Sequence, residues 1–219
     1  MAEPSDPFEV LLRGWVDHAS AEWGYPPALA EQFDAILARL PAGLRALVVN
    51  GHESGLIEPV GGHQFTLRGL TPGKGPYAWV ARDATSKTVT MNWEYLVQAA
   101  EYARVYAALT PRGYVVGVED RLMDITVSDL DGTLLWYLEV KVRADEVQGL
   151  VKRVINWGHQ GIDLLAPDRG DDPLRKAKYL IHYRPRYFSV VAIGIRLDFV
   201  VAYKDANRFR LTEDMVPFA

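Results

Sequence analysis

The feature of this sequence that most constrains the fold is an Asp-Gly pair, Asp131 and Gly132, between two runs of apolar and β-branched residues. Asp-Gly is a preferred pair for the two-residue type I′ turn that joins neighbouring antiparallel strands. We therefore predict a β-hairpin centred on this pair, in which Asp124 lies directly opposite Glu139. Side chains alternate between the two faces of a strand, so Lys141 lies on the same face as both carboxylates.

The predicted juxtaposition of Asp124 and Glu139 indicates a site for a divalent cation. Opposed residues on neighbouring strands have β-carbons about 4.5–5.5 Å apart, and like charges there repel each other. Mg²⁺ or Mn²⁺ offsets this repulsion, because such cations bind carboxylate oxygens. The bound cation polarises a phosphoryl oxygen and lowers the pKa of its water, while Lys141 orients that water or stabilises developing negative charge. A solvated sheet face, on which Lys141 neutralises one carboxylate, is the alternative.

Apolar periodicity predicts the elements around this hairpin. Helical spacing predicts helices over residues 7–20, 29–40, 92–109, 144–157 and 174–183. Residues 44–90 hold short apolar runs, such as Leu47-Val48-Val49, among glycines and prolines, and we predict strands and turns there. Further strands are predicted over residues 114–128, 134–142, 187–195 and 199–203. This order predicts an α/β (α+β) fold, a mixed β-sheet core flanked by helices with an N-terminal helical and β appendage.

Charge is distributed unevenly over a chain whose formal net charge is −4. The segment 175–210 holds nine Lys and Arg against two Asp. This asymmetry predicts a surface that faces a polyanion, although a solvated basic face balancing an acidic one fits the charges equally well. Four cations interleaved with tyrosines are the predicted contacts to a nucleic-acid backbone: Lys176, Lys178, Arg184 and Arg186.

Composition excludes several classes of protein. Apolar types make up 49% of the residues and charged types 24%, which indicates a globular chain with a core rather than a disordered one. The absence of cysteine excludes disulfides, thiolate metal ligands and thiol nucleophiles. The longest apolar run, around Ser189, is too short to span a bilayer, and the acidic N-terminus is unlike a signal peptide. We expect a soluble, cytoplasmic protein with no membrane partner.

Four segments follow one another in an order that carries a family resemblance. They are a helix with Glu101, the pair Gly113-Tyr114, a β-run with Asp124-Ile125, and a strand with Glu139-Val140-Lys141. This order resembles the PD-(D/E)XK nuclease superfamily, which includes restriction endonucleases and Holliday-junction resolvases. The resemblance covers about residues 92–205, whereas residues 1–90 resemble no family that we can name.

The resemblance implies a Mg²⁺- or Mn²⁺-dependent nuclease that hydrolyses phosphodiester bonds in DNA, in defence, repair or a mobile element. Asp124 and Glu139 would hold the metal ion, and Lys141 would assist the attacking water. Glu101 would be an accessory carboxylate, with Glu94 as its substitute in another helix register.

The same resemblance implies a restriction-endonuclease-like domain over residues 89–219, after a soft boundary. Residues 1–88 would form an appendage for substrate choice, for a homodimer or for a partner protein. Met123 departs from the family name, which has proline at this position.

Two other functions and one other metal site are open. The segment from Val127 to Leu134 also resembles the first motif of haloacid-dehalogenase-type phosphatases, with Asp129 as nucleophile and Asp131 as acid/base. That reading is disfavoured because the chain continues as a strand after this motif. The second alternative is a nuclease fold without catalysis that acts as a binding or scaffold protein. His52-Glu53 and His63 suggest a metal site, but without a helical i,i+4 pair we favour a loop.

Overall fold

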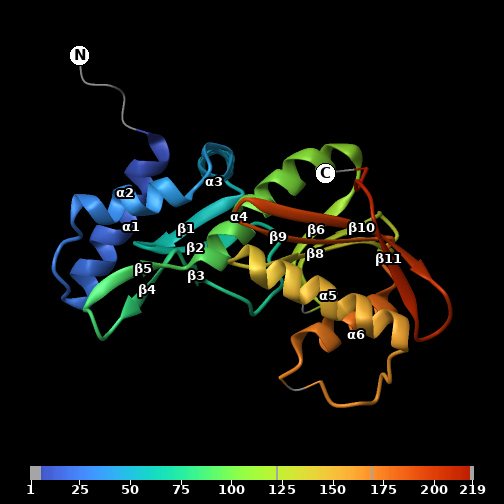
Figure 1. The fold of residues 1–219 in the computed structure, drawn as a ribbon. Helices are drawn as coiled ribbons and strands as arrows, with labels where there is room; N and C mark the ends of the chain where they lie inside the picture. Colours follow the sequence, from blue (N-terminus) through green and yellow to red (C-terminus); the bar gives the residue numbers. More distant parts are fainter. Residues whose placement is uncertain (1–5, 122, 169, 218–219) are drawn as a thin grey trace. The chain divides into compact units, whose positions relative to one another are not determined.

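A computed structural model of the protein describes residues 6–121, 123–168 and 170–217. The chain forms two compact units, Met1–Arg104 and Val105–Ala219 (Figure 1). The division falls within helix α4 (Trp93–Leu109). The predicted boundary at residues 88/89 stays a prediction. Helices and both parallel and antiparallel strands occur in the described residues, so the predicted mixed α/β class is confirmed.

The first unit combines helices with short antiparallel strands. Its helices are α1 (Pro7–Trp23), α2 (Ala30–Arg39) and α3 (Ala42–Glu53). Its strands are β1 (Ile57–Gly61), β2 (Gln64–Leu67), β3 (Tyr77–Ala78), β4 (Val80–Asp83) and β5 (Thr88–Met91). Strands β1, β2 and β3 form one sheet, and β4 pairs with β5 in another.

Stacked aromatic rings form the centre of the first unit. The ring of Trp79 stacks on Trp15 of α1 with centroids 4.4 Å apart, and on Phe65 of β2 with centroids 3.7 Å apart. All three side chains are buried. Large aromatic side chains contribute strongly to core stability, so this stack attaches α1 to the strands.

The prediction of strand structure at Leu47-Val48-Val49 is wrong, because these residues lie in α3. Helical spacing places buried Val48 and Gly51 three residues apart on one face. A β-carbon at Gly51 would lie 2.5 Å from Cδ1 of Ile57, so glycine allows the helix to approach β1 closely. The β-branched pair suggested a strand, but packing against β1 favours the helix.

The second unit contains a mixed sheet of six strands in the order β11-β10-β9-β8-β7-β6. The strands are β6 (Val115–Asp120), β7 (Met123–Ser128), β8 (Leu134–Val140), β9 (Tyr187–Ala192), β10 (Ile195–Tyr203) and β11 (Phe209–Glu213). Strands β8 and β9 are parallel, and the other pairs are antiparallel. A parallel pair requires a long crossover connection. Helices α5 (Ala144–Gln160) and α6 (Asp172–Tyr183) lie in that connection.

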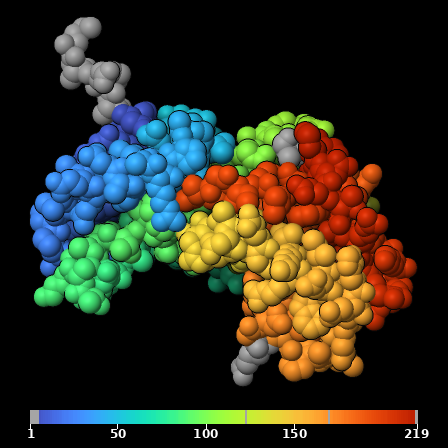
Figure 2. Space-filling view, viewed as in Figure 1, coloured from blue at the N-terminus to red at the C-terminus, as the bar shows by residue number. Residues whose placement is uncertain are grey.

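Helices α5 and α6 cover one face of this sheet and lie side by side at the surface (Figure 2). Their apolar stripes include Val147, Val154 and Leu180, which pack in one buried cluster with Phe188 and Val190 of β9. Residues that alternate along a strand share a face. The side chains of β8 that point to α5 and α6 therefore belong to this covered face.

The hairpin β7–β8 has the predicted register but not the predicted turn. Thr126 opposes Tyr137 and Ile125 opposes Leu138, as expected. The turn is a three-residue loop, Leu130-Asp131-Gly132, closed by a hydrogen bond from Asp129 N to Thr133 O at 3.2 Å. A three-residue loop shifts the pairing by one residue, and an irregularity between Val127 and Ser128 restores it. The prediction of a two-residue type I′ turn is therefore wrong, although the predicted register is confirmed for residues 125–127 opposite 136–138.

Most other predicted elements are confirmed within a few residues at their ends. The predicted β-run over 114–128 is two strands, β6 and β7, and β11 was not predicted. No helix in the described ranges combines the length and apolar character needed to cross a bilayer.

Candidate active site

Glu139 lies at the centre of a charged cluster on the covered face of the six-stranded sheet. In the parallel register it pairs with Val190 of β9, and it follows Tyr137 on the same face of β8. Its side chain is 1% exposed. A buried carboxylate is costly unless it is paired and hydrogen-bonded, so its contacts determine whether the fold tolerates it.

Three side chains satisfy Glu139. The ammonium Nζ of Lys141, just after β8, lies 2.7 Å from Oε1. The Nζ of Lys176 on α6 lies 2.8 Å from Oε2, and the hydroxyl of Tyr137 donates to the same oxygen. Charge-assisted hydrogen bonds of this kind are among the strongest in proteins.

Asp124, on β7, approaches β8 through its side chain. Its Oδ2 accepts a hydrogen bond of 2.7 Å from the backbone N–H of Val140. Burial raises the pKa of Asp124 well above its ordinary value, and the Glu139 carboxylate raises it further. Lys176 and Lys141 oppose this shift without cancelling it. Burial, and to a lesser extent the neighbouring Glu139 carboxylate, therefore disfavours the ionised form of Asp124.

Asp172, the first residue of α6, completes the cluster. Its Oδ2 lies 3.4 Å from Lys141 Nζ, and its Oδ1 lies 3.8 Å from Lys176 Nζ. Burial alone would lower the pKa of both lysines, but Glu139 and the other carboxylates raise it overall. The two lysines in turn hold the pKa of Asp172 below its ordinary value despite burial. Three carboxylates thus share two ammonium groups.

The predicted residues Asp124, Glu139 and Lys141 are brought together, and Lys176 joins them. Lys176 was predicted to contact a nucleic-acid backbone, but its side chain is 8% exposed and ion-paired with Glu139. This position indicates a role inside the cluster rather than on an exposed phosphate-binding surface. A signal for this placement exists in the sequence, because Lys176 lies three residues after buried Pro173 and four before buried Leu180 on one helical face.

The other predicted nucleic-acid contacts lie outside the cluster. Lys178 donates to the backbone carbonyl of Ala166 and lies 3.6 Å from Asp168. Arg184 and Arg186 are exposed, and the Arg184 guanidinium lies 4.2 Å from the ring centroid of Tyr203. Contact of these three side chains with DNA stays a prediction.

Glu101 belongs to the first compact unit, whereas Asp124 belongs to the second. Its Oε2 accepts hydrogen bonds from the guanidinium of Arg104, the shorter at 2.8 Å. The accessory role of Glu101, and that of its substitute Glu94, stays a prediction.

The carboxylates of the phosphatase-like motif serve the hairpin turn. Asp129 and Asp131 each accept a 2.9 Å hydrogen bond from the backbone N–H of Thr133, and Asp131 also accepts one from its hydroxyl. The chain then continues as β8. Capping of a turn by aspartate is ordinary turn chemistry, and it accounts for this motif.

No family model matches the chain, and neither the curated proteins nor the solved structures contain a match. We therefore infer a function from the geometry of the cluster.

Proposed function

We propose that the second unit is a metal-dependent nuclease domain with a restriction-endonuclease-like core that hydrolyses phosphodiester bonds in DNA. The observation that carries the proposal is the position of Asp124 and Glu139 on adjacent strands, with Lys141 Nζ 2.7 Å from Glu139. The order of three antiparallel strands, a helical crossover and a parallel fourth strand supports it. The sequence resemblance to PD-(D/E)XK nucleases depends on the same order of elements.

A Mg²⁺ or Mn²⁺ ion suits the oxygen donors of this cluster. Hard cations bind carboxylate oxygens, which Asp124 and Glu139 supply. The raised pKa of Asp124 also fits a site that a cation completes, because a bound cation would stabilise its ionised form. Both oxygens of Glu139 already contact ammonium groups, so binding requires at least one lysine to move away from its present contact.

The residues around the metal have separate roles in this proposal. The bound ion would supply a water of lowered pKa and polarise the phosphoryl group. Lys141, whose side chain is 20% exposed, would orient the attacking water or stabilise negative charge on the phosphate. Lys176 and Tyr137 hold the Glu139 carboxylate in position from inside the core. Exposed Arg184 and Arg186 would contact the phosphate backbone.

One observation favours a second candidate, a nuclease fold that binds DNA or a protein without catalysis. The chain's own lysines and Tyr137 satisfy Glu139, so the cluster has a structural explanation that needs no metal. The two candidates differ in one respect: only the nuclease requires the carboxylates to bind a divalent cation.

Cleavage of supercoiled plasmid and of single-stranded DNA tests the proposal, with Mg²⁺, Mn²⁺ or EDTA in the buffer. We expect nicking with either cation and none with EDTA. The Asp124→Asn variant should lose about 10²-fold or more in rate, because loss of a metal ligand costs more than loss of its outer partner. Thermal unfolding should show stabilisation of the wild type by Mn²⁺ and no such effect in Asp124→Asn.

The matched control is Asp129→Asn, which changes a half-buried carboxylate that precedes the same hairpin loop. It should nick DNA at the wild-type rate. Metal-independent melting together with intact DNA would support the scaffold candidate. Turnover of a small phosphate ester that depends on Asp129 would support the phosphatase instead.

A further inference from the structure

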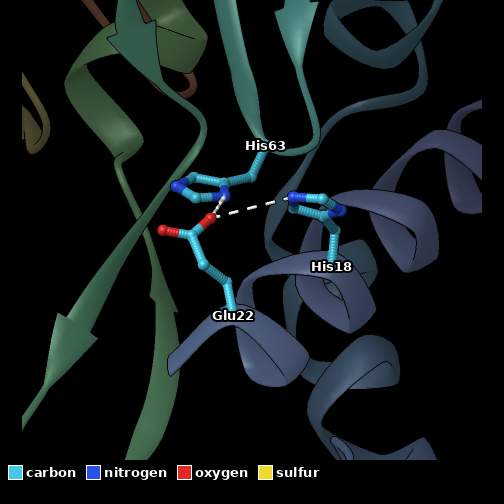
Figure 3. A group of neighbouring side chains, drawn as sticks. All are labelled: His18, Glu22 and His63. Carbon is cyan, nitrogen blue, oxygen red and sulfur yellow. Dashed lines mark ion pairs between the residues drawn. The ribbon is translucent and has the colours of Figure 1, made fainter. Parts of the chain in front are cut away.

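The first unit holds a second cluster of chemically reactive side chains, which the proposed nuclease does not use. His18 and Glu22 lie four residues apart on α1, and His63 lies in the turn between β1 and β2. Figure 3 shows the three side chains pointing toward one another. The Glu22 Oε2 atom lies 3.7 Å from His18 Nε2 and 3.6 Å from His63 Nδ1. All three ligand atoms lie within 4.8 Å of one another.

His63 gives an independent indication of a missing partner. Its side chain is 6% exposed, and the buried Nδ1 atom makes no hydrogen bond to any described residue. A buried polar atom without a hydrogen bond destabilises the folded state, so such atoms call for an explanation. Nδ1 points into the space between Glu22 and His18 (Figure 3). A cation in that space would accept its lone pair.

Gly62 allows His18 to occupy this position. A β-carbon built at Gly62 would lie 1.9 Å from Cδ2 and 2.0 Å from Nε2 of His18. The φ angle of Gly62 is +49°, in the left-handed region that favours glycine. The hairpin turn therefore provides both the ligand His63 and the space for the imidazole of His18.

We propose that His18, Glu22 and His63 bind one divalent transition-metal ion of the Zn²⁺ type, through two imidazole nitrogens and one carboxylate oxygen. Tetrahedral zinc at about 2.0–2.1 Å from its ligands sets them about 3.3 Å apart. The distances from Glu22 to the two imidazoles need to close by a few tenths of an ångström, and the distance between the two imidazole nitrogens, which is at most 4.8 Å, by up to about 1.5 Å. Imidazole ligands favour zinc, copper or nickel over Mg²⁺. The His18 and Glu22 side chains are about half exposed, which gives the ion a route from solvent.

The ion would connect α1 to the β1–β2 hairpin. Three protein ligands leave one tetrahedral position for water or another ligand, as in zinc sites that are not purely structural. The site lies wholly within the first unit, so its ion would be additional to the Mg²⁺ or Mn²⁺ of the proposed nuclease.

Metal binding to the full-length protein tests this proposal directly. After removal of metal with EDTA, zinc is titrated by calorimetry, and Co²⁺ is added separately to follow the visible absorption of a tetrahedral cobalt site. We expect one equivalent of tight zinc binding, a tetrahedral cobalt spectrum, and a higher melting temperature with zinc.

Two conservative variants remove ligands from partly exposed positions, so the fold should be retained. His18→Gln and Glu22→Gln should each weaken zinc binding at least about tenfold, because even outer partners of metal ligands contribute that much. His159→Gln is the matched control, since it changes an exposed histidine on α5. Circular dichroism confirms that each variant is folded.

The outcomes separate this site from the carboxylate cluster of the second unit. Asp124→Asn should bind zinc like the wild type. The proposal is overturned if the folded wild type binds no zinc, if His18→Gln and Glu22→Gln bind it unchanged, or if Asp124→Asn loses it. Loss of nuclease activity alone would leave zinc binding intact and would affect only the proposed function.

Discussion

The two polar clusters of this protein differ in how their buried polar atoms are paired. In the second unit, Glu139 is almost fully buried and is satisfied by two ammonium groups and a hydroxyl of the same chain. In the first unit, the buried His63 nitrogen has only a carboxylate at 3.6 Å and no hydrogen bond among the described residues. The Glu139 cluster is therefore complete without a ligand. In the first unit, by contrast, the potential metal-ligand atoms of His18, Glu22 and His63 face one another.

Because of this difference, the Glu139 cluster should affect the stability of the fold itself, whereas the histidine cluster should affect stability through metal binding. A buried carboxylate that is paired internally stabilises the fold only as long as all its partners remain. A group of metal ligands without an ion contributes little until the ion binds, and then stabilises the folded state in proportion to its affinity. Substitution of Glu139 should therefore lower stability in any buffer, and substitution of His18 or Glu22 should act mainly through metal.

Removal of the Glu139 charge should have the largest effect on stability. Glu139→Gln keeps the size of the side chain but removes the closer ionic partner of buried Lys176 and leaves Asp172 at 3.8 Å. We expect the free energy of unfolding to fall by about 3–5 kcal/mol, the usual cost of breaking a buried ion pair. Urea unfolding measures it as a lower midpoint with an unchanged slope.

The control for this experiment is Glu213→Gln on β11, where the glutamate is exposed and a change within about 0.5 kcal/mol is expected. The double variant Glu139→Gln/Lys176→Met should recover part of the lost stability, because it removes the stranded charge. If Glu139→Gln lowers the free energy of unfolding by less than about 1 kcal/mol, the buried lysine does not depend on Glu139 for charge compensation, which contradicts this description of the cluster.

Addition of a methyl group at Gly62 should have an intermediate effect. Gly62→Ala places a β-carbon against the His18 ring and strains a left-handed residue, so we expect a loss of about 1–2 kcal/mol and much weaker zinc binding. Gly132→Ala is the matched control, since Gly132 also has a positive φ but no described atom lies within 4 Å of its added β-carbon. Zinc calorimetry on both variants distinguishes the steric effect from backbone strain; equal zinc affinity in the two would show that His18 is not a ligand.

The smallest effect should come from His52, a half-buried histidine of the first unit outside the metal cluster. Burial lowers its pKa below the ordinary value of 6.5. As pH falls through 6.5 the unfolded chain binds a proton before the folded chain does, so the free energy of unfolding decreases toward acid. The slope is at most about 1.4 kcal/mol per pH unit for one proton.

His52→Phe keeps a ring beside the stacked Trp15 and Trp79 and should remove the part of this pH dependence that comes from His52. Urea unfolding between pH 5 and 7.5 in EDTA measures it, with His159→Gln retaining the wild-type slope. A variant whose slope equals that of the wild type would place the titration at another group.

The carboxylate pair was predictable because a strand has a side-chain period of two. Once Thr126 opposes Tyr137, Asp124 and Glu139 share a face whatever the detail of the turn. The predicted two-residue turn was wrong. The register still agrees with the prediction because the three-residue loop and the irregularity beside Ser128 shift it in opposite directions. This compensation depends on how the strands pack, so the identity of the turn residues alone does not predict it.

The partners contributed by other elements were not predicted. Lys176 reaches Glu139 from a helix 37 residues further along the chain, and its placement among basic residues suggested a surface role instead. His63 was grouped with His52 and Glu53 because they are near in sequence, whereas the structure places it beside His18 and Glu22 of α1. Contacts between distant segments depend on tertiary packing, which local periodicity does not specify.

The most direct test of the central claim is the position of Mn²⁺ in a crystal of the wild-type protein, located by its anomalous scattering. We expect a peak within bonding distance of both Asp124 and Glu139, with the ammonium group of Lys141 or Lys176 displaced from its present contact. Anomalous density absent from this pair, with both lysines still on Glu139 at saturating Mn²⁺, would contradict the claim.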